Sequence, residues 1–326
     1  MQPTAPSDFR LTVAPMLDWT DRHCRYFHRL LSPHARLYTE MVTSAALVRG
    51  GQVRLLEHSH EEHPVALQLG GSDPAELATA AAMGARAGYD EINLNVGCPS
   101  DRVQSGRFGA CLMREPALVG ECVRAMAGAV DVPVTVKCRI GVDDQDAYAD
   151  LQRFTEAMVE AGVRSLVVHA RKAWLQGLSP KENREIPPLD YDRVYRLKRE
   201  FPELTIVING GITTVESVRA HLAHVDGVML GRAAYHDPYV LAQLEADLYG
   251  TPLPGRREVL ERMRIYVEAE LARGTQLKHI TRHILGLFQG EQGARGFRRL
   301  LSEGAHLPGA DWSLIASALA PFRQAA

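Results

Sequence analysis

The sequence has little cysteine and no long apolar run. Five cysteines occur in 326 residues, and they form no C-x-x-C pair. This scarcity excludes a disulfide framework and a cysteine-rich zinc site, and it is typical of a reducing compartment such as the cytoplasm. We therefore expect no metal.

No apolar stretch approaches the roughly 20 residues that a membrane-spanning helix needs. The opening segment, MQPTAPSDFR, has no basic region followed by an apolar run, so we expect neither a secretory signal nor a membrane partner. Hydrophobic residues make up 46% and charged residues 23% of the chain, which is typical of a soluble globular protein. The length allows one domain of roughly 250 residues and a smaller one.

The chain also has little net charge, −2 in total, but the charge is unevenly distributed. Residues 251–326 contain 11 Lys and Arg against 7 Asp and Glu, which leaves a net charge of −6 for residues 1–250. A basic patch on a small appended domain favours a polyanionic partner, and a solvated helix face is the alternative. The basic residues within 271–300 are Arg273, Lys278, Arg282, Arg295, Arg298 and Arg299.

Eight short β-rich runs alternate with helical patterns, and several runs are almost continuously apolar, as in parallel strands that are covered on both faces. The stretch 73–88 is typical of the helices, with Asp73 as N-cap, Pro74 in the first turn and Gly88 at the end. Eight such units predict an α/β fold, a (β/α)₈ TIM barrel. A doubly wound sheet is the alternative, but no G-x-G-x-x-G follows the first run. The runs cover residues 11–16, 35–41, 64–70, 91–97, 133–140, 165–171, 205–211 and 227–233.

A Pro/Gly break, TPLPGRRE, follows residue 250 and predicts a domain boundary there. We expect residues 1–250 to form the barrel and residues 251–326 to form a small all-helical bundle. The helical patterns cover residues 256–273, 276–290, 292–303 and 310–321.

Polar residues or glycines stand at the ends of almost all the predicted strands. Chemistry in (β/α)₈ enzymes occurs at the carboxyl ends of the strands, so this ring predicts an active site. Its members are Pro15, Met16, Glu40, Gln68, Asn95, Cys98, Lys137, Arg139, His169, Arg171, Asn209, Gly210, Gly211, Gly231 and Arg232.

The last two runs, INGGI (208–212) and MLGRA (229–233), place glycines where barrels often bind a phosphate group. Glycine lets backbone N–H groups approach an anion, and Arg232 adds a charged donor. The alternative is that these glycines only turn the chain.

Gln68, Lys137 and His169 are expected to line the space between this phosphate site and the first strand. A flavin ring needs such donors and acceptors, and a cation such as Lys137 stabilises its reduced, negatively charged form. The alternatives are a Schiff-base lysine, as in barrel aldolases, a lysine that only reaches solvent, and a histidine that is only part of the core.

Cys98 lies in NLNVGCPS (93–100), on the turn that follows a buried strand. A cysteine thiol is mostly protonated at neutral pH, so Cys98 can act as a general acid. A nucleophilic thiolate activated by Lys137 is the alternative. We expect the other four cysteines to be structural.

Taken together, these segments resemble the tRNA-dihydrouridine synthases, and most closely their A-type subfamily. The resemblance covers nearly the whole chain, and the stretch RKAWLQGLSPKENREIPPL is its most specific part. It also includes the segments APMLDWTDRHCRYFHRL, YTEMVTSAAL, LQLGGSDP, EINLNVGCPSDRVQSGRFGACLM, VKCRIGVDD, INGGI, LGRAAY and RHILGLFQGEQGARGFRRLLSE.

The resemblance implies an enzyme that binds FMN and uses NADPH to reduce uridines 20 and 20a of tRNA to 5,6-dihydrouridine. We expect a monomer in the cytoplasm. In such an enzyme Cys98 protonates uracil C5 while flavin N5 delivers hydride to C6, and the segment SDRVQSGRFGACLM is a mobile loop. The flavin contacts implied are Pro15, the Met16 backbone, Gln68, Lys137 and His169, and the phosphate-end contacts are Asn209, Gly210, Gly211, Gly231 and Arg232. The tRNA contacts implied are Asn95, Arg139, Arg171, Lys172, Arg295, Arg298 and Arg299.

Two other functions are compatible with parts of the sequence. One is a flavin barrel that acts on a free pyrimidine, which leaves the basic tail without a role. The other is an RNA-binding protein without turnover, against which the presence of Cys98, Lys137 and His169 argues. Trp19 and Tyr38 are expected near the rim, where they can stack on a flipped base, with packing as the alternative for Trp19.

Overall fold

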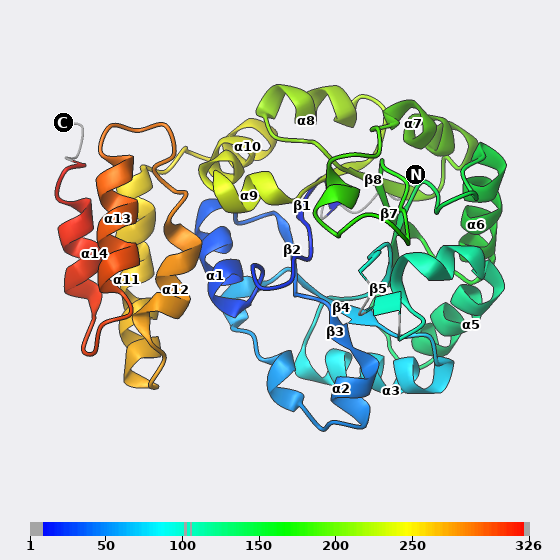
Figure 1. The fold of residues 1–326 in the computed structure, drawn as a ribbon, viewed down its shortest axis with the longest axis horizontal. Helices are drawn as coiled ribbons and strands as arrows, with labels where there is room; N and C mark the ends of the chain where they lie inside the picture. Colours follow the sequence, from blue (N-terminus) through cyan, green and yellow to red (C-terminus); the bar gives the residue numbers. More distant parts are fainter. Residues whose placement is uncertain (1–8, 101–102, 105, 323–326) are drawn as a thin grey trace.

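The structure is a computed structural model that describes residues 9–100, 103–104 and 106–322. Eight of its parallel strands form a barrel in the order β2-β1-β9-β8-β7-β6-β5-β4, which the pairing of β2 with β4 closes. This confirms the predicted (β/α)₈ TIM barrel (Figure 1). The strands are β1 (Leu11–Val13), β2 (Arg36–Tyr38), β4 (Val65–Gly70), β5 (Glu91–Val96), β6 (Val134–Arg139), β7 (Ser165–His169), β8 (Thr205–Asn209) and β9 (Gly227–Leu230).

The sequence runs predicted each barrel strand but not a short additional one. Strand β3 (Val42–Thr43) pairs only with the end of β4 in the described sheet. Its two residues directly precede a helix, so no alternation of apolar and polar residues could mark them as a strand.

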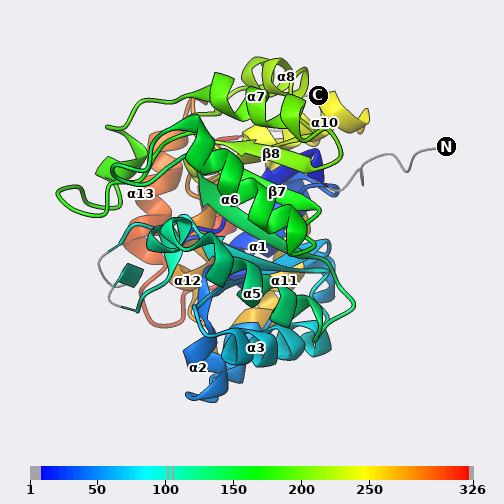
Figure 2. The ribbon, with the colours of Figure 1, turned by 90° about the vertical axis from the view of Figure 1, so that its right-hand side faces the viewer.

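Helices cover the outside of the barrel, as Figure 2 shows for α3, α5 and α6. The strands are buried on both faces, which explains their apolar composition. The helices of this part are α1 (Arg22–Leu31), α2 (Ser44–Val48), α3 (Pro74–Ala87), α5 (Pro116–Ala127), α6 (Tyr148–Glu160), α7 (Tyr191–Glu200), α8 (Val215–Leu222), α9 (Arg232–His236) and α10 (Tyr239–Tyr249). Short 3-10 helices are η2 (Val53–Leu56), η3 (His60–Glu62), η4 (Gly109–Arg114) and η5 (Glu182–Arg184).

Helix α3 has the ends that the sequence predicted. The Asp73 side chain accepts a hydrogen bond from the Glu76 N–H at 2.8 Å, and Pro74 begins the helix. Gly88 ends it with φ of +98°, a left-handed conformation that glycine adopts without strain.

Four helices follow the barrel and lie beside it in Figure 1: α11 (Arg256–Ala272), α12 (Leu277–Ile284), α13 (Ala294–Gly304) and α14 (Trp312–Leu319). The predicted helix 276–290 is too long, because α12 ends at Ile284. A Cβ on Gly286 would lie 2.4 Å from the His236 carbonyl oxygen, so the chain beyond α12 turns where it meets the barrel. Within the described residues, no helix is both long and apolar enough to span a bilayer.

The helical part is attached to the barrel through α1. The Arg22 guanidinium forms an ion pair with Glu270, His23 Nδ1 lies 2.7 Å from the Tyr266 hydroxyl, and the Asp21 carboxylate lies 3.0 Å from His283 Nε2. One hydrophobic cluster continues from the barrel helices into α11–α14. These contacts hold the two parts together despite the Pro/Gly break after residue 250.

Candidate active site

The strand register places the predicted site residues in rows at the carboxyl end of the barrel. Arg139, His169 and Asn209 are neighbours across β6, β7 and β8, and Asn95 lies beside Lys137 one level below. The register therefore brings these five residues together at one end of the barrel.

Lys137 is held by its neighbour on β8. Its Nζ donates to Asn209 Oδ1 at 3.2 Å, and Asn209 Nδ2 donates to the Met229 carbonyl oxygen at 2.7 Å. The side chain of Asn209 thus orients Lys137. The role of Asn209 at the phosphate end of a ligand stays a prediction.

The site is rich in positive charge. Burial lowers the pKa of Lys137 to about 8, and Arg139 adds to that effect. Burial, Arg139 and Lys137 also hold the pKa of His169 well below its ordinary value, so His169 is neutral. Among the described residues no carboxylate forms an ion pair with Lys137. An ammonium group in such surroundings favours an anionic ligand, which fits a phosphate group and a reduced flavin ring.

Arg139 binds the backbone around the site. Its Nε donates to the Gly97 carbonyl oxygen at 2.8 Å, and its Nη1 donates to the carbonyl oxygens of Lys172 and Asn183 at 3.1 and 3.0 Å. Burial lowers its pKa to about 10. The guanidinium connects the Cys98 turn to the segment after β7, and its contact with a substrate stays a prediction.

Cys98 lies on a turn that Asn95 fixes. Asn95 Oδ1 accepts hydrogen bonds from the N–H groups of Gly97 and Cys98 at 3.1 and 3.0 Å. The thiol is half-buried and lies 3.5 Å from the Ser100 hydroxyl, to which it donates. The Cys98 carbonyl accepts from the Ala110 N–H at 2.8 Å, so η4 supports the turn.

The other cysteines have the structural surroundings that the sequence predicted. Cys24, Cys122 and Cys138 are buried, and the half-buried Cys111 donates to the Phe108 carbonyl oxygen at 3.1 Å. Three residues of the segment predicted to be a mobile loop, at positions 101, 102 and 105, lie outside the described residues.

The paired glycines after β8 are required by the turn itself. Gly210 and Gly211 have φ of +118° and +70°. A Cβ on Gly210 would lie 2.7 Å from His169 Cδ2, and one on Gly211 would lie 2.7 Å from a Leu189 methyl carbon. A Cβ on Gly231 would meet Ala14 only at 3.9 Å, so this position has more room. Their contacts with a phosphate group stay predictions.

Charged side chains at the edge of the site form contacts with other parts of the chain. Arg232 Nη1 lies 2.5 Å from Glu185 Oε1, and Lys172 Nζ lies 2.8 Å from Asp146 Oδ2. Arg171 donates to the Pro187 carbonyl oxygen. The predicted roles of Arg171, Lys172 and Arg232 toward a ligand therefore compete with contacts inside the chain.

Residues of the same segment were missed by the sequence reasoning because they follow no strand. Asn183 is buried, accepts from the Trp174 N–H at 2.8 Å and donates to the Trp174 carbonyl oxygen at 2.9 Å. Arg184 contributes to lowering the His169 pKa. The only sequence signal for them was the specificity of the stretch RKAWLQGLSPKENREIPPL.

The turn after β1 carries Pro15 and Met16. The Met16 N–H donates to the Thr20 hydroxyl at 2.9 Å, so that backbone donor is already engaged. Trp19 stacks on Tyr235 with ring centroids 4.5 Å apart, which confirms a packing role. The placement of Tyr38 near the rim is wrong: its side chain is fully buried and its hydroxyl donates to Glu91 at 2.9 Å, because it points into the barrel from β2.

Arginines predicted to bind tRNA lie on one face of α13. Arg295, Arg298 and Arg299 are spaced by three and four residues, so their side chains are neighbours on the helix surface. Arg295 and Arg299 are exposed, and Arg298 Nη1 donates to Gln289 Oε1 at 2.9 Å.

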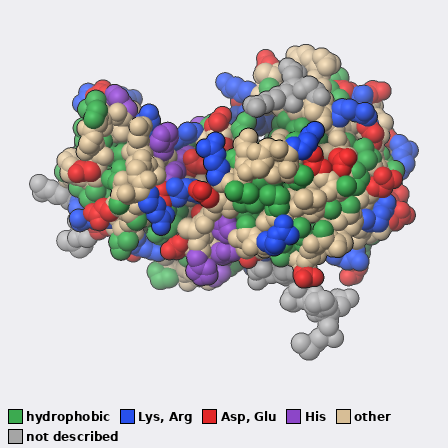
Figure 3. Space-filling view, turned by 90° about the horizontal axis from the view of Figure 1, so that it is seen from below, with side chains coloured by type: hydrophobic (Ala, Val, Ile, Leu, Met, Phe, Trp, Pro, Cys, Tyr) green, Lys and Arg blue, Asp and Glu red, His purple; other side chains and the backbone are tan. Residues whose placement is uncertain are grey.

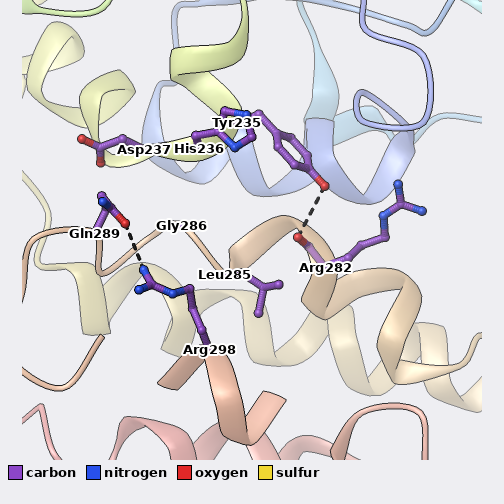
Figure 4. Close-up of a pocket in the computed structure, with 8 residues that line it drawn as sticks. All are labelled: Tyr235, His236, Asp237, Arg282, Leu285, Gly286, Gln289 and Arg298. Atoms are coloured by element: carbon purple, nitrogen blue, oxygen red, sulfur yellow. Dashed lines mark hydrogen bonds between the residues drawn. The ribbon is translucent and has the colours of Figure 1, made fainter. Parts of the chain in front are cut away.

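A cavity of about 620 Å³ opens between α9 and this helical part (Figure 4). Arg282 and Arg298 belong to its lining, and the Tyr235 hydroxyl donates to the Arg282 carbonyl oxygen at 3.4 Å. A second cavity of about 420 Å³ includes Arg295 and Arg298. Figure 3 shows the molecule hollowed between its two parts, with Lys and Arg side chains along the hollow. Carboxylates also line the two cavities, Asp237 in the first and Glu291 in the second.

Comparisons with known proteins identify the family of this chain. The family model described as Dihydrouridine synthase (Dus) matches residues 12–321. The chain is 64% identical over 317 residues to the tRNA-dihydrouridine(20/20a) synthase of Xanthomonas campestris pv. campestris, covering 97% of this chain and 95% of that protein. It is 60% identical over 320 residues to the protein of the same name from Vibrio cholerae, covering 97% and 98%.

The match extends over both the barrel and the four C-terminal helices, so it includes the ring of polar residues, the Cys98 turn and the basic face of α13. The identity of 64% extends over 97% of this chain. The chain therefore belongs to the dihydrouridine synthase family, whose enzymes depend on a flavin.

Proposed function

We propose that this protein reduces uridines 20 and 20a of tRNA to 5,6-dihydrouridine. The single observation that carries the proposal is the Cys98 thiol on a fixed turn at the mouth of a barrel that also holds the cations Lys137 and Arg139 and the imidazole of His169. The names of the similar proteins from Xanthomonas and Vibrio support the same reaction and positions.

FMN is the flavin that fits these residues. Lys137 would stabilise negative charge on the reduced ring, and Gln68, His169, Pro15 and the Met16 backbone would contact the same ring. Arg232 and the glycines at 210, 211 and 231 form the phosphate end, next to Asn209. When bound, FMN that NADPH has reduced supplies the hydride that adds to C6 of the uracil ring.

The chain itself supplies the proton. The Cys98 thiol donates a proton to uracil C5 and becomes a thiolate, which solvent then reprotonates. Asn95 and Arg139 orient the uracil edge, and Arg171 or Lys172 contacts its phosphate.

The tRNA partner gives the helical part its role. A uridine inside folded tRNA reaches the barrel only if it leaves its stack, which costs a few kcal/mol. Phosphate contacts from Arg295, Arg298 and Arg299 hold the tRNA while this occurs. We therefore assign residues 1–250 to catalysis and residues 251–326 to tRNA binding, in a monomeric cytoplasmic enzyme that needs no metal.

Single-turnover oxidation of the reduced protein tests the proposal. The flavin is reduced anaerobically with NADPH, unmodified tRNA is added, and the return of the flavin's visible absorption band is followed while dihydrouridine is mapped. We expect rapid reoxidation with dihydrouridine at position 20 or 20a. Reoxidation by free uridine or UMP but not by tRNA would contradict the proposal and favour a small-molecule enzyme.

A further inference from the structure

A continuous line of side-chain hydrogen bonds runs inside the barrel from Glu91 to the Cys98 turn. It begins at the Glu91 carboxylate, which is completely buried at the start of β5. Arg36 Nη1 donates to Glu91 Oε2 at 3.0 Å. The hydroxyls of Tyr38, at 2.9 Å, and of Thr135 both donate to Glu91 Oε1. The carboxylate is therefore surrounded by donors.

Three amides continue the line above Thr135. Asn93 Nδ2 donates to Thr135 Oγ1 at 2.8 Å, and Gln68 Nε2 donates to Asn93 Oδ1 at 2.8 Å. Asn95 Nδ2 donates to Gln68 Oε1, also at 2.8 Å. Asn95 Oδ1 then accepts the N–H groups of Gly97 and Cys98. All of these side chains are buried.

Every link in the line donates toward Glu91. Burial raises the pKa of Glu91, while the ion pair with Arg36 favours its ionised form. An ionised carboxylate only accepts hydrogen bonds, so the Thr135 hydroxyl donates to it and accepts from Asn93. The same logic fixes which amide atom of Asn93, Gln68 and Asn95 faces its neighbour, because a flipped amide would bring two donors or two acceptors together. The Arg36–Glu91 pair thus sets the direction of the whole line.

Stability alone does not require such a line. Barrel interiors are usually filled by branched aliphatic side chains, which carry no desolvation cost. Buried polar groups cost free energy unless each one is hydrogen-bonded, and an apolar replacement of a buried ion pair is often as stable. A polar line that ends at the predicted flavin and substrate contacts therefore points to function.

We propose that Glu91 and Thr135 are positioning residues, which fix the amide orientation of Gln68 and Asn95 and hold the Cys98 turn. Gln68 and Asn95 each keep a second amide hydrogen that the line does not use, and we infer that a bound ligand accepts it. The inference rests on the proposed function, because the positioned groups are those assigned to flavin and uracil.

The test compares Thr135→Val with Thr135→Ser in the full-length, flavin-loaded protein. Valine keeps the shape of threonine but removes the hydroxyl, whereas serine keeps the hydroxyl and removes the methyl group. We expect Thr135→Val to lower kcat for tRNA about tenfold, which corresponds to about 1.4 kcal/mol, with an unchanged KM. We also expect it to shift the visible absorption band of the bound flavin, and we expect Thr135→Ser to behave like the wild type in both readouts.

Two results would overturn the inference. One is a folded Thr135→Val protein with wild-type kcat and flavin band, and the other is an equal loss of kcat in both variants. If Thr135→Val does not fold, Thr135→Cys replaces it, because a thiol is only a weak donor and acceptor. If the wild type itself fails to reduce tRNA, the proposed function is wrong, and the flavin band of the two variants still decides whether the line orients Gln68.

Discussion

At the scale of single residues, the barrel mouth contains positive charge that the chain does not neutralise. Lys137 donates to an amide oxygen and not to a carboxylate, and Arg139 donates to three carbonyl oxygens. Burial lowers the pKa of both side chains, and neighbouring arginines add to this effect. The folded protein without ligand therefore carries a cost that an anionic ligand relieves.

Replacing Lys137 by methionine tests this cost. The pKa of Lys137 is about 8 in the folded protein and 10.5 ordinarily. The unfolded chain therefore holds the proton to higher pH, and the destabilising charge is fully present below about pH 8 and lost toward about pH 10.5. We expect the flavin-free Lys137→Met protein to be more stable than the wild type in urea at neutral pH.

Two further measurements accompany the comparison of Lys137→Met with the wild type. The stability difference should shrink when the unfolding is repeated above about pH 10, where the wild-type lysine is neutral in both states. The variant should also bind FMN more weakly. A methionine variant that is less stable than the wild type at neutral pH would show that the charge is compensated.

Cys98 provides a second prediction at this scale. We expect Cys98→Ala to keep its bound flavin and its reduction by NADPH but to form almost no dihydrouridine, because only the proton donor is lost. The measurement is single-turnover reoxidation by unmodified tRNA. Cys111→Ala is the matched control, since Cys111 is also half-buried but donates to a backbone carbonyl. Full activity of Cys98→Ala would remove the general-acid role.

The sequence identified the residues of the site better than it identified their partners. Because Lys137 and Asn209 stand at the ends of predicted strands, the sequence marked both as site residues. Only the structure shows that Asn209 Oδ1 accepts from Lys137 Nζ and so orients it. Tyr38 was expected at the rim, and its inward direction follows from the closure of the barrel by β2 and β4. Such contacts join residues far apart in the chain, which no local pattern contains.

At the scale of elements, the sequence predicted those helix ends that depend on residues within the same helical turn. The ends of α3 were predictable because Asp73, Pro74 and Gly88 act within one turn of the helix. The early end of α12 was not, because it depends on how closely Gly286 approaches His236 of the barrel. Tertiary contacts decide such boundaries.

The segment between β7 and α7 yields a prediction at this scale. Glu185 pairs with Arg232, and both side chains are partly exposed, so the pair contributes little to stability. If Arg232 binds the FMN phosphate as proposed, Glu185 competes with that phosphate for the same guanidinium. We expect Glu185→Gln to bind FMN about twofold more tightly at low salt. Glu182→Gln is the control, because Glu182 caps the Ser179 N–H. Weaker FMN binding by Glu185→Gln would show that the pair helps to build the phosphate site.

At the scale of the whole molecule, the barrel and the helical part act as one body. Asp21 caps α1 and also contacts His283, so the same carboxylate stabilises a barrel helix and the junction. Burial raises the pKa of Asp21, but His283, the Cys24 N–H and His23 together outweigh burial, so the pKa of Asp21 is lowered. A fixed junction keeps the basic face of α13 at a constant position relative to Cys98, as a rigid substrate such as folded tRNA requires.

Charge reversal on α13 tests this arrangement. We expect Arg298→Glu combined with Arg299→Glu to weaken tRNA binding and to flatten its salt dependence, because fewer counterions are released when phosphate contacts are lost. The control is Arg262→Glu combined with Arg264→Glu on α11, which changes the net charge equally at exposed positions. The measurement is the tRNA dissociation constant over a series of salt concentrations. Equal weakening by both pairs would mean that overall charge, and not the basic face of α13, governs the affinity, since the loss of specific contacts must weaken binding more than the same charge change elsewhere.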